Sequence, residues 1–357
     1  NDTSSDVFDA PSRICRHMAA NASLPHKHQK MYHSFLFLLA FFCTLIVAAN
    51  GAMTTISKGI VSTALGDVHY LTTKSSSSSS EGNDQNAKTP CLAFHMSPRS
   101  VDEYREAIPF LSEYTDDKGD DVQNNRIIVA MDELGYGFSG IPKRSCTIDE
   151  MADAMLEVAN HLSIDRFIAI GSLLGCFISL SLASRYPDRV CAVVLTNVYH
   201  YPPKPPSSSS STKEEEKEEE VWEVKEDGTH LTAIWNKRSS WLDPKLNSRI
   251  TYDEMSYLLK KQERYSSKIF IQDASAYDFE SAAKGTKCPI LCIRGEGATT
   301  LFDAIGLDLS GQFEKAVGMM EDVEVAPAVK PGGLNLINQD AEQWSEIVNK
   351  FLASKGL

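Results

Sequence analysis

The chain has 357 residues, of which 42% are hydrophobic and 23% are charged, and its formal net charge is -13. That length accommodates an α/β domain of about 250–300 residues together with additional segments. Because the sequence contains neither a basic patch nor basic residues interleaved with aromatic ones, it excludes nucleic acid as a partner. Part of the negative charge is local, since six glutamates lie within Lys213–Glu220.

An apolar run, Phe35–Ala49, follows a polar N-terminal tail over residues 1–30. The run is short for a membrane span, which needs about 20 residues, and long for the apolar core of a signal peptide, which has about 7–15. Lys27 and Lys30 precede it, which predicts a cytosolic N-terminus and a translocated domain. We therefore predict a signal peptide or signal anchor over residues 31–52, and a domain in the secretory pathway or held at a membrane by the uncleaved segment. An apolar helix docked on the domain is the alternative.

Predicted strands and helices alternate after this segment. Gly59–Thr73 alternates apolar and polar residues and predicts a hairpin. Capping boxes at Ser100-x-x-Glu103 and Thr147-x-x-Glu150 predict helices that end near residues 112 and 162. Such alternation predicts an α/β fold with a mostly parallel sheet covered by helices on both faces. Short apolar runs predict the buried strands Cys91–Phe94, Arg126–Met131, Arg166–Ile170, Arg189–Thr196 and Cys288–Arg294.

The alternation stops between residues 198 and 286. A Pro- and Ser-rich stretch, Tyr201–Ser211, and the glutamate-rich tract precede three of the four tryptophans. Thr251 then predicts the cap of a helix that ends near residue 265. We interpret this stretch as a helical lid inserted after the sixth core strand of one domain over residues 56–357.

The pentapeptide Gly-Ser-Leu-Leu-Gly at residues 171–175 lies between a predicted strand and a predicted helix. It resembles the nucleophile elbow G-x-S-x-G of the α/β-hydrolase superfamily, in which a serine occupies a sharp turn between strand and helix. The two glycines of that motif allow the strand and the helix to approach closely. Leu173 is the central residue here. A register centred on Ser172 would put Ile170 and Leu174 at the two positions that need small residues.

Further landmarks in the same order extend the resemblance over residues 56–357. His95 matches the histidine of the family's oxyanion loop, and the segment from His95 resembles a subgroup with H-Q-T-P-R-S at this place. Residues 132–139 resemble the D-x-x-G-x-G-x-S turn after the fourth strand. Residues 185–190 and 287–296 resemble the R-Y-P-E-R-V and K-C-P-x-L-x-x-x-G-E segments. The resemblance implies an α/β-hydrolase fold with an inserted lid.

The catalytic triad of this family follows the chain order serine, acid, histidine. Carried over by position, the resemblance puts Leu173 at the nucleophile, Ala298 at the acid and Leu334 at the base. The three residues depend on one another, because the serine needs the histidine as a base and the histidine needs the carboxylate to hold its tautomer. Loss of the serine therefore removes the need for the other two. We expect these three residues to form an apolar plug in a ligand pocket lined by His95, Met96, Leu173, Leu174 and Leu334.

The resemblance and its departures favour a non-catalytic protein that binds a small apolar molecule or a protein partner. The alternative is a divergent hydrolase or a non-hydrolytic enzyme with relocated residues, for which Ser172, His95 and His200 are the candidates. In that case N–H groups near Met96 and Leu174 would polarise a carbonyl. A membrane-tethered scaffold is a third hypothesis. The sequence has no Gly-rich phosphate loop and no metal-ligand spacing, so we expect no cofactor and no metal.

Overall fold

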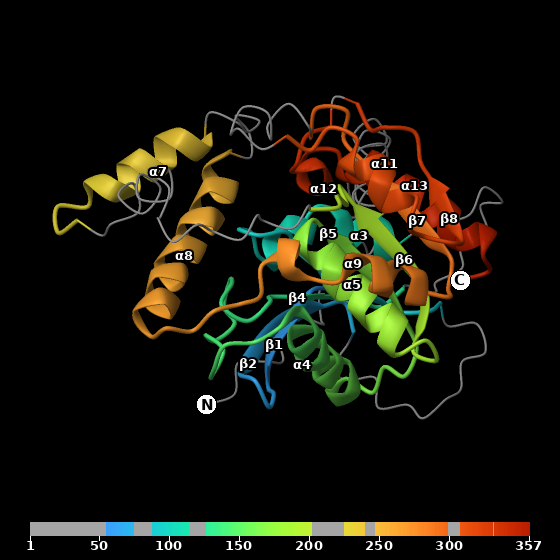
Figure 1. Cartoon of the computed structure of the whole chain (residues 1–357), viewed down its shortest axis with the longest axis horizontal. Helices are drawn as coiled ribbons and strands as arrows, with labels where there is room; N and C mark the ends of the chain where they lie inside the picture. The colour runs from blue at the N-terminus through green and yellow to red at the C-terminus, as the bar shows by residue number, and fades with distance from the viewer. Residues whose placement is uncertain are drawn as a thin grey trace, which may run out of the picture. The chain divides into compact units, whose positions relative to one another are not determined.

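The computed structural model describes residues 55–74, 88–113, 126–201, 225–239, 247–298, 308–330 and 332–357. They contain an eight-stranded sheet with the order β1-β2-β4-β3-β5-β6-β7-β8 (Figure 1). The predicted signal segment and the glutamate-rich tract lie outside the described residues. The strands are β1 (Ser57–Ser62), β2 (Asp67–Thr72), β3 (Cys91–Phe94), β4 (Ile128–Met131), β5 (Phe167–Ser172), β6 (Val190–Thr196), β7 (Ile290–Ile293) and β8 (Val323–Val325).

The sheet is mostly parallel, as predicted. β1 and β2 form the predicted antiparallel hairpin, and β2 pairs antiparallel with β4. The remaining neighbours are all parallel pairs. Every residue of β3, β4, β5 and β7 is buried, which explains why these strands are uninterrupted apolar runs in the sequence.

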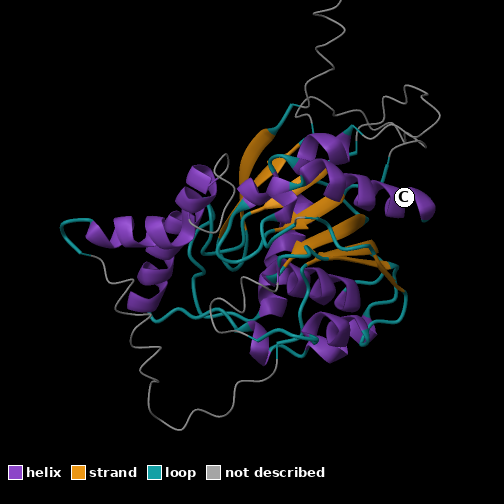
Figure 2. Ribbon diagram, turned by 90° about the horizontal axis from the view of Figure 1, so that it is seen from above, coloured by secondary structure: helices purple, strands orange, loops and turns teal. Residues whose placement is uncertain are grey.

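Helices cover both faces of the sheet (Figure 2). Alternate residues of β3 belong to different apolar clusters, with Leu92 and Phe94 in one and Cys91 and Ala93 in the other. Because side chains alternate across a strand, these two clusters are the cores on the two faces. The first core includes residues of α4 (Ile148–His161), α5 (Leu174–Arg185), α9 (Phe279–Gly285) and α11 (Gln312–Val317). The second includes residues of α3 (Ala107–Ser112), α12 (Leu336–Gln339) and α13 (Ala341–Ser354).

One predicted capping box forms and the other does not. Thr147 and Glu150 bond reciprocally at the start of α4, as predicted. The box expected at Ser100 is wrong, because the Glu103 side chain turns away from Ser100 and accepts a hydrogen bond from the Met96 N–H at 2.7 Å. The predicted helix is also divided into a short 3-10 helix, η1 (Val101–Tyr104), and α3.

The interruption between β6 and β7 contains helices, as predicted. α8 starts four residues before Thr251, so the predicted helix start is wrong. Figure 1 shows α7 and α8 beside each other at the left of the view, away from α9 and the sheet. None of the helices in the described ranges is long and apolar enough to cross a bilayer. The segment comprises α7 (Thr229–Ser239), α8 (Asn247–Ser266), the 3-10 helix η2 (Ala274–Ala276) and α9.

Gly175→Ala should lower the free energy of unfolding by at least about 2 kcal/mol, a typical cost of overpacking a rigid site. A Cβ at Gly175 would lie 2.1 Å from the Phe94 carbonyl oxygen, which is backbone and cannot rotate away. Gly140→Ala is the matched control, since its Cβ would meet no atom closer than 3.6 Å. Urea unfolding of both variants measures the difference, and equal stabilities would contradict the close approach.

Candidate ligand-binding site at the elbow

Leu173 occupies the sharp turn between β5 and α5. Its backbone has φ 45° and ψ -103°, and its side chain is buried. A non-glycine residue held in this region stores roughly 1–3 kcal/mol of strain. A Cβ at Gly171 would lie 2.3 Å from the Gly175 carbonyl oxygen, so both positions demand glycine. The local geometry is therefore that of a nucleophile elbow centred on Leu173.

The two residues predicted at the acid and base positions have no titratable side chain. Ala298 is fully buried and directly follows the turn at Glu296 and Gly297, which comes after β7. Leu334 is half-buried and packs against the same apolar core that contains Leu173. Asn197, which the sequence analysis did not single out, joins the two turns. Its Oδ1 accepts a hydrogen bond from the Gly295 N–H at 3.0 Å, and its Nδ2 donates to the Leu334 carbonyl at 3.4 Å.

His95 supports two loops through both ring nitrogens. Nε2 accepts a hydrogen bond from the Glu133 N–H at 3.1 Å, so Nδ1 carries the proton and donates to the Met96 carbonyl at 2.9 Å. The ring is fully buried, and burial lowers its pKa. His95 is consequently neutral, and neither nitrogen is available to take a proton from a nucleophile.

The structure does not bring the other two candidates together. Ser172 is fully buried, and its hydroxyl lies beside the Glu103 carboxyl, whose pKa it lowers, although no well-formed hydrogen bond to the hydroxyl is present among the described residues. His200 is half-buried, with Nδ1 3.3 Å from Gln312 Oε1 and its ring edge against Phe279. No histidine therefore holds the Ser172 hydroxyl within hydrogen-bond reach in the described structure, and activation of a serine needs that contact.

Two buried glutamates lie near the elbow, and sequence reasoning missed their role. Glu103 is fully buried, and burial raises its pKa to about 7, although Arg99 and the bond from Met96 act in the opposite direction. Glu133 is also fully buried. Burial, with the nearby charges of Glu103 and Asp132, raises the pKa of Glu133 well above its ordinary value. The signal for Glu133 was a pair of acidic residues, Asp132 and Glu133, that directly follows the buried strand β4.

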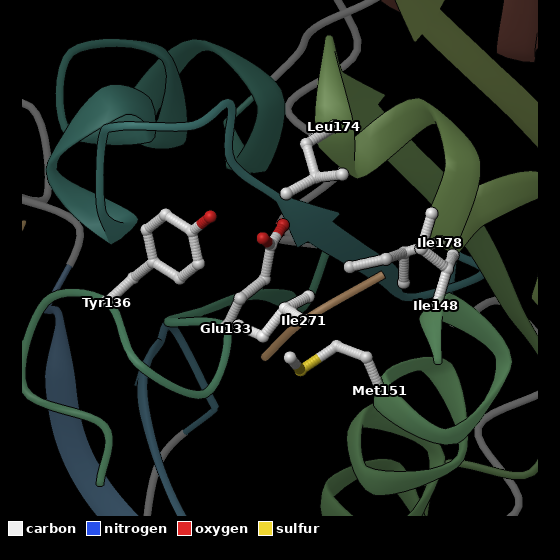
Figure 3. A pocket seen from close by; sticks show the side chains of 7 residues that line it. All are labelled: Glu133, Tyr136, Ile148, Met151, Leu174, Ile178 and Ile271. Carbon is white, nitrogen blue, oxygen red and sulfur yellow. The ribbon is translucent and has the colours of Figure 1, made fainter. Parts of the chain in front are cut away.

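Glu133 points into a small cavity next to the elbow (Figure 3). Its volume is about 10 Å³, close to that of one water-sized probe. Of the five predicted pocket residues, Leu174 is the one that lines this cavity. Figure 3 shows the Glu133 carboxyl group directed toward Leu174, with Tyr136 on one side. The lining residues are Glu133, Tyr136, Ile148, Met151, Leu174, Ile178 and Ile271.

Comparison with known proteins identifies the architecture. A family model described as alpha/beta hydrolase fold matches residues 98–238. A thermophilic esterase from Thermogutta terrifontis superposes with a TM-score of 0.57 at 14% identity, over 84% of this chain and 99% of that one. An enol-lactonase from Burkholderia xenovorans gives 0.57 at 17% identity, over 83% and 100%. The chain has the α/β-hydrolase fold.

Sequence relatives match shorter stretches. Haloalkane dehalogenase 2 from Mycobacterium tuberculosis is 32% identical over 138 residues, which are 38% of this chain and 40% of that protein. The human 1-acylglycerol-3-phosphate O-acyltransferase ABHD5 is 29% identical over 86 residues, which are 23% and 25%. The match therefore spans about two fifths of the length of the first relative and a quarter of the second.

In this α/β-hydrolase fold, α8 is fixed to the loops that carry the two glutamates. Asp253 of α8 accepts hydrogen bonds from Arg99 Nε at 2.9 Å and from the Ser100 N–H at 3.0 Å. Tyr257 of α8 stacks on Tyr136 with ring centroids 4.7 Å apart. Since Arg99 is fully buried, removal of Asp253 would leave an uncompensated charge.

Arg99 also reaches the loop that carries Leu334. Its Nη1 donates to Asn335 Oδ1 at 2.6 Å and to Asn338 Oδ1 at 3.0 Å. One guanidinium group thus joins the segment after β3, α8 and the loop that carries Leu334. The described residues contain no group of His, Cys, Asp or Glu side chains suited to hold a metal ion.

Stability should depend on pH through Glu103. Its pKa is higher in the folded protein than the ordinary value of 4.5, so its stabilising contribution is full below that value and is lost as the pH rises to about 7. Relative to Glu103→Gln, the free energy of unfolding of the wild type should fall by roughly 2–3 kcal/mol between pH 5 and pH 8. Urea titrations at both pH values measure this difference. Glu342→Gln, at an exposed site, should show no such change, and parallel pH profiles for wild type and Glu103→Gln would refute the assignment.

Proposed function

We propose that this protein uses its α/β-hydrolase fold to bind a small apolar molecule without hydrolysing it. The observation that carries the proposal is Leu173, which occupies the elbow with the backbone geometry of a nucleophile position. Leucine has no atom that can attack a carbonyl or displace a leaving group. The backbone of the site is preserved while its reactive group is absent.

The acid and base positions support the same interpretation. Ala298 and Leu334 replace a pair whose burial is costly and whose task depends on a nucleophile. Asn197 bonds both turns, so the framework of the site persists without the charged pair. The coordinated loss of three residue types is expected once the first has gone.

The enzyme hypothesis loses one of its proposed donors. The Met96 N–H is bonded to Glu103 Oε2 at 2.7 Å, so it is not free to polarise the carbonyl of a substrate. His95 is occupied at both nitrogens, and no histidine bonds the Ser172 hydroxyl among the described residues. These contacts favour binding over a relocated hydrolytic mechanism.

The cavity lining indicates the character of the ligand. Five of its seven residues are aliphatic or methionine side chains. The names of similar proteins, a haloalkane dehalogenase and an enol-lactonase, refer to small organic molecules. We extend that size class to the ligand of this chain. We also propose that the segment between β6 and β7 acts as the lid of the site. Residues 31–52 would direct the domain to the secretory pathway or hold it at a membrane.

The purified chain should not hydrolyse p-nitrophenyl acetate above a heat-denatured control. It should also resist labelling by a fluorophosphonate, because that reagent requires an activated serine. Ser172→Ala should behave like the wild type in both assays. Turnover by the wild type that Ser172→Ala abolishes would overturn the proposal.

Restoring the serine alone should not restore activity. Leu173→Ser should give no acyl-enzyme burst, because no base lies at the acid and base positions to accept the proton. The triple variant Leu173→Ser, Ala298→Asp, Leu334→His restores the three residue types and is expected to give weak turnover, since a displacement of about 1 Å costs up to a hundredfold in rate.

Stopped-flow burst kinetics on the single and triple variants, side by side, provide the comparison. A clear burst from Leu173→Ser by itself would show that a base is already in place. His95 and His200 would then be tested by substitution with glutamine.

A further inference from the structure

Two neighbouring carboxyl groups in the chain have opposite environments. Asp132 accepts hydrogen bonds from the Val101 N–H at 2.7 Å and from the Phe138 N–H and His69 Nδ1 at 2.8 Å each. Glu133 is equally buried, yet neither of its carboxyl oxygens has a hydrogen-bond partner among the described residues. A buried polar group without a partner is costly to fold and is rare in native proteins. Such a group, when it points into a cavity, is a candidate to receive a ligand.

The charges around Glu133 indicate the sign of that ligand. Its influential neighbours are the carboxyl groups of Glu103 and Asp132, both of which raise its pKa. The nearby cations are engaged elsewhere, since Arg99 pairs with Asp253 and Lys260 donates to the Ser139 carbonyl at 2.7 Å. The cavity therefore lies in an acidic environment, and among the described residues no side-chain cation pairs with Glu133. An unpaired acidic group favours a positively charged ligand.

The other walls indicate the rest of the ligand. Ile148, Met151, Leu174 and Ile178 offer apolar surface and no charge. Figure 3 shows Leu174 above the Glu133 carboxyl, Ile148 and Ile178 to its right, and Met151 below it. Burial of apolar carbon contributes about 25 cal/mol per Å². A ligand with one basic end and a short hydrocarbon body matches both parts of the lining.

We propose that Glu133 is the anchor of the ligand site, and that the ligand is a small aliphatic amine whose ammonium group pairs with the Glu133 carboxylate. This inference rests on the proposed function and refines it, because it adds one basic end to the otherwise apolar ligand of the same cavity. Burial and the neighbouring carboxyl groups raise the pKa of Glu133, which favours the neutral acid in the free protein. An aliphatic amine is already the ammonium ion RNH₃⁺ at neutral pH, so its binding beside the carboxylate releases the Glu133 proton to solvent, and the number of protons and the total charge are conserved.

The size of the cavity sets the choice of probe. At about 10 Å³ it is much smaller than typical ligand pockets of roughly 300–1,000 Å³, so a guest must displace lining side chains. Ile271, which lies in an isolated bridge with Cys146 after α8, is the lining residue that belongs to the segment between β6 and β7. We therefore choose hexylamine, with hexanol as the neutral molecule of the same length.

The test is isothermal titration calorimetry on the full chain with both probes. Hexylamine should bind the wild type at least tenfold more tightly than hexanol. Its affinity should rise from pH 6 to pH 8, because binding of the ammonium form releases the carboxyl proton to solvent. Glu133→Gln, which keeps the shape and removes the charge, should abolish the preference for hexylamine. Glu324→Gln, at an exposed site on β8, should retain it.

Glu133→Gln should fold, because it removes a buried ionisable group that has no partner, and its melting temperature should be no lower than that of the wild type. Equal binding of hexylamine and hexanol to the wild type, or an unchanged preference in Glu133→Gln, would overturn the anchor while leaving the proposed function intact. Absence of any hexylamine binding would also overturn it. Ester hydrolysis by the wild type would instead overturn the proposed function.

Discussion

The close approach of β5, α5 and the end of β3 is the constraint on which the site depends. Gly175 lies against the Phe94 carbonyl, and Gly171 lies against the carbonyl of Gly175. This approach leaves no room for side chains at two positions and forces the residue between them into a strained turn. The fold therefore holds residue 173 at the carboxyl edge of the sheet whatever its side chain is. The position of the elbow does not depend on whether that residue can react.

A framework of buried polar contacts surrounds this turn. Arg99 links the segment after β3 to α8 and to the loop with Asn335, and His95 links that segment to the loop after β4. Arg99 and His95 each bond at least one residue that is distant in the chain, so removal of one partner would leave another buried polar group unsatisfied. Glu133 stands apart from this framework, because its backbone takes part and its carboxyl group does not.

The unpartnered carboxyl group of Glu133 is better explained by a function than by a contribution to stability. A protein selected for stability alone would place an apolar residue at Glu133, since the surrounding walls are apolar and the carboxyl group has no partner there. Departures from local consistency concentrate at sites that act on something outside the chain. Leu173 shows the opposite case, because its side chain packs in the apolar core at a position where the family has a reactive residue. The two residues together are the basis of our proposal that this site binds a ligand without reacting with it.

The sequence by itself determined the features that depend on local pattern. Apolar runs predicted the buried strands, the Thr147 and Glu150 pair predicted the start of α4, and the glycine spacing predicted the elbow with Leu173 at its centre. Tertiary structure decided the rest, because those features depend on contacts between segments distant in the chain. Ser100 is bonded to Asp253 across 153 positions, which leaves Glu103 to bond Met96 instead of forming a capping box. Asn197 and the unpartnered carboxyl of Glu133 likewise acquire their roles only when strand ends meet at one edge of the sheet. Burial at that edge raises the free energy of a charged carboxylate, and the sequence alone does not show which residues are buried.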